Sequence, residues 1–142
     1  MKEQNIKNHT RLVPGYHGFT LLALLALLIG SIRHLITAEE PEIYNASLIV
    51  LIAVILTSLY YFIRTFALKA QDRAIRAEET LRYFILTGKR LDQRLSYGQI
   101  VALRFASDEE LPALALRAVE ENLGVKDIKL AIKNWRADHH RV

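Results

Sequence analysis

A chain of 142 residues with a net charge of +4 and no cysteine is about one domain's worth of protein. The lack of cysteine excludes disulfides, thiolate metal sites and cysteine nucleophiles. Hydrophobic residues make up 51% of the chain, but they are unevenly placed. The sequence consists of two apolar runs followed by a charged tail, so we predict the structure of each part separately.

The N-terminal segment, residues 1–11, is polar and carries a net charge of +2. We expect it to lie along the inner surface of a membrane. Pro14 and Gly15 interrupt the chain just before the first apolar run. A proline suits the first position of a helix, where its missing N–H costs nothing, so the sequence predicts a helix that begins there.

Residues 12–32 and 43–63 contain no Asp, Glu, Lys or Arg, and each run is 21 residues long. A helix that rises about 1.5 Å per residue needs about 20 residues to cross the hydrocarbon core of a bilayer. The sequence therefore predicts a transmembrane hairpin over residues 12–63, with an acidic connector that contains Pro41. A cleaved signal peptide is the alternative for the first run, but no small-x-small cleavage site follows it.

Basic residues flank the two runs mainly on one side, before the first run and after the second. The positive-inside rule then places both termini in the cytoplasm and the acidic connector outside, as in a multi-pass membrane protein. The candidate lipid-headgroup contacts are the four basic residues that follow the second run: Arg64, Lys69, Arg73 and Arg76. Interleaved acidic residues leave ordinary helix ion pairs as the alternative.

Small residues recur at helical spacing within both runs and could let two helices approach closely in lipid. The predicted helix-packing residues of the hairpin are Ala23, Ala26, Gly30, Ala46, Ala53 and Thr57. Ordinary alanine scatter is the alternative for the first three.

Neither Gly nor Pro occurs from Glu42 to Thr87, so the second apolar helix is predicted to continue through a cytoplasmic extension, residues 64–88. Gly88 is the predicted stop, at the position just past the last turn. A face of this extension repeats at steps of 4, 4, 3, 4 and 3, and its members are Phe66, Ala70, Ala74, Ala77, Leu81 and Phe84. We predict that Ala70, Ala74 and Ala77 are helix-packing residues.

Residues 89–142 are predicted to form a small helical domain of three short helices, which makes the whole chain an all-α membrane protein. Ser96 and Gln99 have capping-box spacing, and so do Ser107 and Glu110. The helix opened by Ser107 is expected to run to Leu123 and to end at Gly124. A third helix is expected from Asp127, with a face that extends to Trp135.

The sequence has no P-loop, no Gly-rich dinucleotide fingerprint, no HExxH and no GxSxG. We therefore expect no catalysis and no cofactor. Asp138, His139 and His140 could ligate a metal, but three adjacent residues at a chain end rarely converge on one ion, so no metal site is predicted.

Residues 119–133 faintly resemble a helix-turn-helix followed by basic residues: Lys126, Lys129, Lys133 and Arg136. Glu120 stands where that motif needs a small residue, and residues 95–142 carry equal numbers of basic and acidic side chains. Nucleic-acid binding is therefore the least favoured function, as a membrane-tethered binder.

The polar residues of the second run suggest a further alternative, a small homo-oligomeric channel lined by Asn45, Ser47, Thr57 and Ser58. The same residues are ordinary packing residues in lipid. The leading hypothesis is an oligomerising or accessory subunit of a membrane complex, whose partners are membrane lipid and copies of itself or other membrane subunits.

Residues 2–9, 13–17, 102–111 and 132–138, together with the two apolar runs, resemble a family of small bacterial membrane proteins with two transmembrane helices. That family is of unknown function. The resemblance covers essentially the whole chain and implies a bacterial inner-membrane setting with a cytoplasmic helical tail. It implies no activity and no functional residues.

Overall fold

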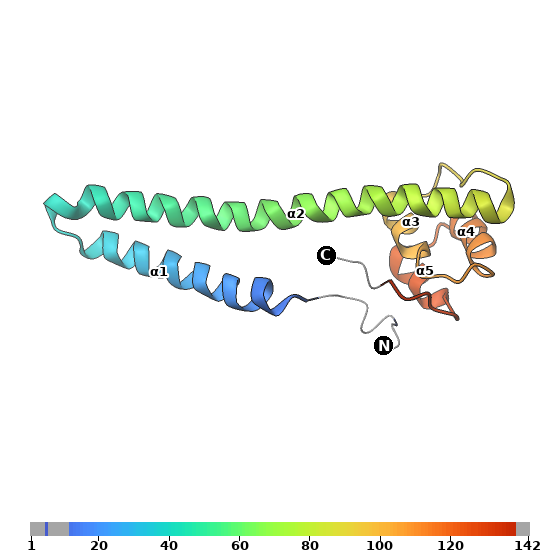
Figure 1. The fold of residues 1–142 in the computed structure, drawn as a ribbon, viewed down its shortest axis with the longest axis horizontal. Helices are drawn as coiled ribbons and strands as arrows, with labels where there is room; N and C mark the ends of the chain where they lie inside the picture. Colours follow the sequence, from blue (N-terminus) through green and yellow to red (C-terminus); the bar gives the residue numbers. More distant parts are fainter. Residues whose placement is uncertain (1–4, 6–11, 139–142) are drawn as a thin grey trace. The chain divides into compact units, whose positions relative to one another are not determined.

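The computed structural model describes Asn5 and residues 12–138, and all regular structure within them is helical. In chain order the elements are the π-helix η1 (Pro14–Thr20), α1 (Leu21–Thr37), the 3-10 turn η2 (Glu40–Glu42), α2 (Ile43–Thr87), α3 (Tyr97–Leu103), α4 (Leu111–Glu120) and α5 (Val125–Ala131). The β structure among the described residues is one isolated antiparallel bridge, between Ala106 and Trp135. The prediction of an all-helical chain is thus confirmed (Figure 1).

Two helical segments, Pro14–Thr37 and Glu40–Thr87, are long and apolar enough to cross a membrane. Prolines open both of them as predicted, since Pro14 and Pro41 each occupy one of the first two helical positions. The described residues form two compact units. We call Leu12–Ala67 the hairpin unit, and we call the described residues from Leu68 to Asp138 the C-terminal unit.

In the hairpin unit, α1 runs back along the first part of α2 (Figure 1). Small side chains let the two helices approach, because Ala46 and Ala53 are fully buried and Ser31 is nearly so. At the other end from the connector, the rings of Tyr16 and Tyr60 stack with centroids 4.2 Å apart. Each of these tyrosine hydroxyls also donates to the other residue's carbonyl oxygen.

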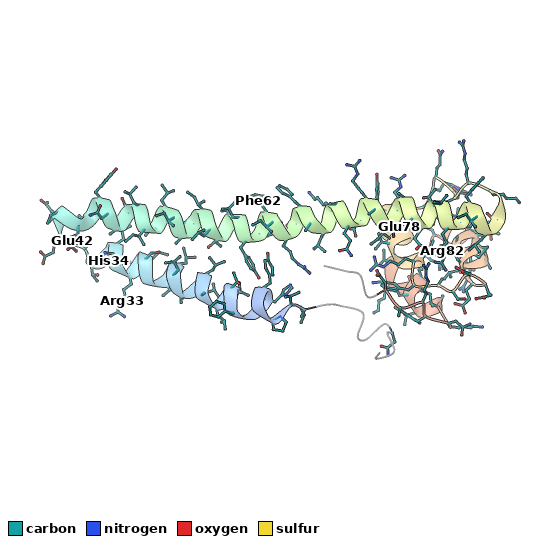
Figure 2. All side chains as sticks on the ribbon, in the orientation of Figure 1. Arg33, His34, Glu42, Phe62, Glu78 and Arg82 are labelled. Carbon is teal, nitrogen blue, oxygen red and sulfur yellow. The ribbon has the colours of Figure 1, made fainter. Side chains whose placement is uncertain are left out.

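Large apolar side chains of the hairpin unit point outward. Leu22 and Ile29 on α1 are each 67% exposed, and Phe62 on α2 projects away from α1 (Figure 2). Charged side chains gather instead at the connector end, where Figure 2 labels Arg33 and Glu42. The unit therefore buries small residues and exposes large apolar ones, which is the reverse of a water-soluble core.

The C-terminal unit has a conventional apolar core, built from α3, α4, α5 and the segments between them. Its largest fully buried side chains are Phe105, Leu103, Leu111 and Ile128. The ring of Trp135 packs on Phe105 with centroids 4.8 Å apart. Because Trp135 reaches this ring from the C-terminal segment, the segment closes the core.

Local signals explain how two of these helices begin and end. Gly88 takes a φ of 69° and donates its N–H to the Phe84 carbonyl, which confirms the predicted stop of α2. The predicted capping box is also present: Ser96 accepts from the Gln99 N–H, and the Gln99 side chain accepts from the Ser96 N–H. The Gln99 amide further donates to the Leu123 carbonyl at 2.9 Å and so ties α3 to the end of α4.

The predicted capping box at Ser107 is present in part, because the Ser107 hydroxyl accepts from the Glu110 N–H at 3.4 Å, but α4 does not begin there. The helix begins at Leu111, after a turn, and its N-cap residue Glu110 makes no side-chain capping bond. The reason is Pro112, which has no N–H and is tolerated only in the first turn of a helix. A start at Ser107 would have placed this proline in the second turn.

The predicted end of α4 at Gly124 is also wrong. Asn122 takes the left-handed conformation, with φ 49°. The N–H of Leu123 bonds to the Ala118 carbonyl and the N–H of Asn122 bonds to the Val119 carbonyl, which is the Schellman arrangement. Asparagine tolerates this conformation better than most residues, so it ends the helix before Gly124 is reached.

Gly124 instead precedes α5, which begins at Val125 rather than at Asp127 and ends at Ala131. Ile132 is already extended, so the predicted helical face toward Trp135 is wrong. Ile132 is nevertheless buried, and Trp135 reaches the core through its bridge to Ala106.

Candidate interaction surface

One face of α2 packs against the small helices of the C-terminal unit, and the residues that it buries are mixed in character. Ile75 and Glu79 on this face are buried. Glu79 accepts from the guanidinium of Arg82 at 2.9 Å, and Arg82 also bonds to Asp108 and to the Ala106 carbonyl. This face is thus held by a charge network as well as by apolar contact, and Figure 2 shows Arg82 among the small helices.

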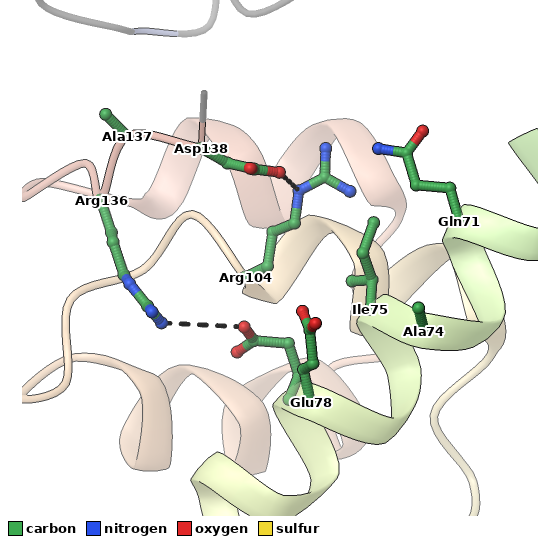
Figure 3. Close-up of a pocket in the computed structure, with 9 residues that line it drawn as sticks. Gln71, Ala74, Ile75, Glu78, Arg104, Arg136, Ala137 and Asp138 are labelled. Atoms are coloured by element: carbon green, nitrogen blue, oxygen red, sulfur yellow. Dashed lines mark ion pairs between the residues drawn. The ribbon is translucent and has the colours of Figure 1, made fainter. Parts of the chain in front are cut away.

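A cavity of about 390 Å³ lies beside this network, between α2, α3 and the C-terminal segment (Figure 3). The guanidinium of Arg104 is buried there and lies 3.2 Å from the Asp138 carboxylate. Arg136 approaches Glu79 at 3.8 Å from the same segment. Two ion pairs thus connect the C-terminal segment to α2 and to the end of α3. Each pair includes one buried charged residue, Glu79 or Arg104, and a buried charge needs an oppositely charged partner.

The opposite face of α2 in this unit is exposed. Ala70, Ala74 and Ala77 are all exposed, and beyond them Leu81 and Phe84 are 60% and 51% exposed. We call these five residues the α2 seam. Other large apolar residues of this unit are also exposed, among them Leu116 and Leu130, but the α2 seam aligns its apolar residues along one helix face, a pattern that favours an interaction surface.

An open groove of about 770 Å³ runs along the seam and is walled by the loop after α2. Its apolar lining includes Leu81, Phe84 and Leu91, and its basic lining includes Arg73 and Arg90. The arginine of the neighbouring turn, Arg76, is stacked over the Tyr97 ring at 4.2 Å.

Residues 1–142 match the family of unknown function DUF6526. The chain belongs to this family. Comparison with curated proteins and with solved structures gives no match. The expectation that the chain belongs to a family of unknown function is therefore confirmed. Membership of DUF6526 does not indicate an activity.

The structure separates the predicted packing residues of this DUF6526 chain into two groups. Ala46 and Ala53 are fully buried in the hairpin unit, and Thr57 is partly buried. On α1, by contrast, the three predicted packing residues are exposed, namely Ala23, Ala26 and Gly30. The buried residue of α1 is Ser31. The three predicted residues do not bring α1 against α2, and a packing role against another chain stays a prediction.

The four predicted headgroup contacts do not share one environment. Arg64 lies in the hairpin unit, with its guanidinium 6.0 Å from the centre of the Tyr16 ring. Lys69 is exposed, Arg73 lines the groove and Arg76 stacks on Tyr97. Lipid contact remains a prediction for all four.

The hydroxyl groups proposed to line a channel bond to their own helix. Ser47, Thr57 and Ser58 donate to carbonyl oxygens three or four residues earlier, at 2.7 to 2.9 Å. Asn45 is exposed. Hydroxyls satisfied in this way behave as ordinary residues of a helix in an apolar setting.

The remaining candidates are dispersed. Lys126 and Lys129 belong to α5, whereas Lys133 and Arg136 lie beyond its end, so the four basic residues do not share one helix. Of the candidate metal ligands, His139 and His140 lie outside the described residues. Among the described residues no group of three or more His, Asp or Glu side chains is placed to hold a metal ion.

The sequence analysis did not predict the charge network of Glu79, Arg82 and Asp108, or the buried ion pair of Arg104 beside it. One signal was present: Arg104 interrupts the apolar stretch from Ile100 to Phe105, and a charge within such a stretch indicates a buried ion pair. Its partner Asp138 is 34 residues away, a distance at which sequence alone gives no pairing signal.

Proposed function

We propose that this chain is a non-catalytic, membrane-anchored assembly subunit. The hairpin unit holds it in a bacterial inner membrane, with both termini in the cytoplasm, and the C-terminal unit presents the α2 seam to another membrane subunit. The α2 seam is the observation that carries this proposal, because it aligns exposed Leu81 and Phe84 with three alanines on one helix face, beside an open groove.

Membrane anchoring is supported by the outward-facing residues of the hairpin unit. In the most apolar 18-residue stretch of each candidate span, only 6% of the first and 11% of the second is buried inside the chain. A soluble protein would bury such helices in its core, whereas lipid solvates large apolar side chains directly. The basic residues before the first span and after the second support cytoplasmic termini, by the positive-inside rule.

Lipid contact belongs to the same proposal. Arg64 directly follows the second apolar run, and Lys69 is exposed beyond it. Both suit anionic headgroups at the inner surface, at about 1 kcal/mol for each basic residue. Arg73 and Arg76 are further candidates, since both are exposed, and Arg76 also stacks on Tyr97.

The test is the mass and composition of the native particle after gentle extraction from membranes. We expect a particle larger than one chain, composed of several copies or of this chain with fixed amounts of other subunits. Leu81→Glu should dissociate the particle, because a charge on the seam would have to be desolvated at the contact. Leu116→Glu is the matched control, since Leu116 is 55% exposed on α4, away from the seam, and should leave the mass unchanged. A monomeric, partner-free chain would overturn the proposal.

A further inference from the structure

The α2 seam has the spacing of a coiled-coil interface. From Ala70 its members follow at steps of 4, 3, 4 and 3, which assigns them to alternating d and a positions of a heptad repeat. Ala74 and Leu81 are then a residues, and Ala70, Ala77 and Phe84 are d residues. Apolar residues at this spacing let two helices supercoil around each other with side chains interlocked.

The C-terminal unit occupies the other side of the same helix. Ile75 and Glu79, which are buried against the small helices, fall at the b and f positions. These positions point away from an a/d interface. A second helix on the α2 seam would lie over the open groove that Ala77, Leu81 and Phe84 share with the loop after α2.

The charges beside the seam are complementary to those of a second, parallel copy. The register places Arg73 at a g position and Glu78 at the e position five residues later. In a parallel pair, the g residue of one helix meets the following e residue of the other. Arg73 is exposed at the groove, and Glu78 is exposed at the rim of the cavity that also contains Arg104 and Arg136 (Figure 3). Neither Arg73 nor Glu78 takes part in an ion pair that the structure shows among residues 12–138.

The next such pair extends the apolar surface instead. Thr80 occupies the following g position and Ile85 the following e position. Ile85 is 72% exposed, so it widens the seam beside Leu81 and Phe84, where large side chains are concentrated. The alanines upstream contribute close approach, and these three residues contribute most of the apolar area.

We infer that the α2 seam binds the same seam of a second copy of this chain in a parallel two-stranded coiled coil, with Arg73 of each copy paired to Glu78 of the other. The inference rests on the proposed membrane anchoring for its direction. Since α2 also carries the second candidate span, copies inserted with the same topology present their seams in the same N-to-C direction. Confinement to one membrane raises the effective concentration, so a seam of this length suffices.

The chain has no cysteine, so single-cysteine variants report contacts cleanly. Identical a or d residues of a parallel pair lie within disulfide reach of each other. We expect Ala70→Cys, Ala74→Cys and Ala77→Cys each to form disulfide-linked dimers in native membranes under mild oxidation. Asp72→Cys is the control, because Asp72 is exposed at an f position. Its dimer yield should be about ten-fold lower, since f residues face away from the partner.

The pattern of cross-links decides between the occupants. An antiparallel pair of copies would link at no more than one of the three positions, and a different protein on the seam would give no homodimer at any of them. Either result overturns the inference. If the native particle contains a single copy with other subunits, the inference falls while the proposed function stands; if the chain is monomeric, both fall.

Charge reversal tests the register independently. Arg73→Glu and Glu78→Arg should each lower the cross-linking yield of Ala77→Cys several-fold, because each juxtaposes like charges twice across the pair. The double variant should restore the yield, since it recreates the opposite-charge pairs in reverse. Failure of the double variant to restore it would overturn the Arg73–Glu78 pairing. Unchanged Trp135 fluorescence checks that each variant remains folded.

Discussion

In the hairpin unit the fully buried residues are Ala46 and Ala53, and the large apolar side chains point outward, whereas the C-terminal unit buries Leu103 and Phe105 to 1% exposure. An exposed leucine therefore has a different meaning in each unit. On the proposed membrane spans it is solvated by lipid, but on the C-terminal unit it is an unfavourable contact with water. This difference is why we propose an interface at Leu81 and Phe84 and not at Leu22.

The largest expected effect comes from identical truncations in the two units. Leu103→Ala should destabilise the C-terminal unit by about 2–5 kcal/mol, because it leaves a cavity in a packed core. Leu51→Ala removes the same atoms from a side chain that is 53% exposed on the hairpin unit. Trp135 is the single tryptophan of the chain and lies in the C-terminal core, so its fluorescence follows the unfolding of that unit in urea.

In that experiment Leu51→Ala should leave the Trp135 transition within about 0.5 kcal/mol of wild type, as expected of substitutions outside a packed core. Equal shifts for the two variants would break the comparison, because they would mean that the hairpin unit depends on its large apolar residues as a soluble core does.

A smaller effect is expected from the charge network. Glu79→Gln removes the carboxylate that accepts from Arg82 and that Arg136 approaches. We expect the C-terminal unit to lose about 1–3 kcal/mol, the usual contribution of a hydrogen bond to a charged group when its partner is buried. Glu121→Gln is the control, since its ion pair with Arg117 is about half exposed and should contribute little. If both substitutions are neutral, the network does not hold α2 against the small helices.

The end of α4 should respond more weakly still. Asn122→Gly places the residue with the least strain at a position whose φ is 49°. We expect a gain of up to about 1 kcal/mol in the unfolding free energy, partly offset by the greater entropy of glycine in the unfolded chain. Asn122→Val should be destabilising, because a β-branched residue is a genuine outlier there. A gain with valine would contradict the Schellman ending of α4 seen in the structure.

The smallest effect is expected at an exposed loop pair. The guanidinium of Arg94 bonds to the Asp92 carboxylate at 2.7 Å and lowers the pKa of Asp92 to about 2, from an ordinary value of 3.8. A lowered pKa in the folded state stabilises the protein above the ordinary pKa, and this contribution is lost as the pH falls through about 2. Solvent screening keeps it small.

Asp92→Asn should therefore lower the urea midpoint slightly at pH 7, and the difference from wild type should shrink between pH 4 and pH 2. Arg94→Gln should give the same pH dependence. A difference that is constant across this range would mean that Asp92 acts through its turn, where it also accepts from the Arg94 N–H.

Sequence alone determined the elements whose signals are local. The two apolar runs, the proline starts of both helical segments, the stop of α2 at Gly88 and the Ser96 capping box all follow from residues within one or two turns of each other. The ends of α4 also carry local signals, but these signals compete. Pro112 favours a helix that starts just before it, and Asn122 tolerates the left-handed conformation that ends a helix. The capping-box spacing at Ser107 and the glycine at position 124 favour other ends, and local sequence does not decide between them.

Only the tertiary structure decided which face of α2 is covered. Periodicity selects Ala70, Ala74, Ala77, Leu81 and Phe84 as the apolar face, yet the C-terminal unit packs on the face that carries Ile75 and Glu79. The covered face includes charges, and these are neutralised by Asp108 and Arg136, which are distant in sequence. The spacing of apolar residues along one helix gives no information on such partners, so only the folded chain shows that the seam is the exposed face.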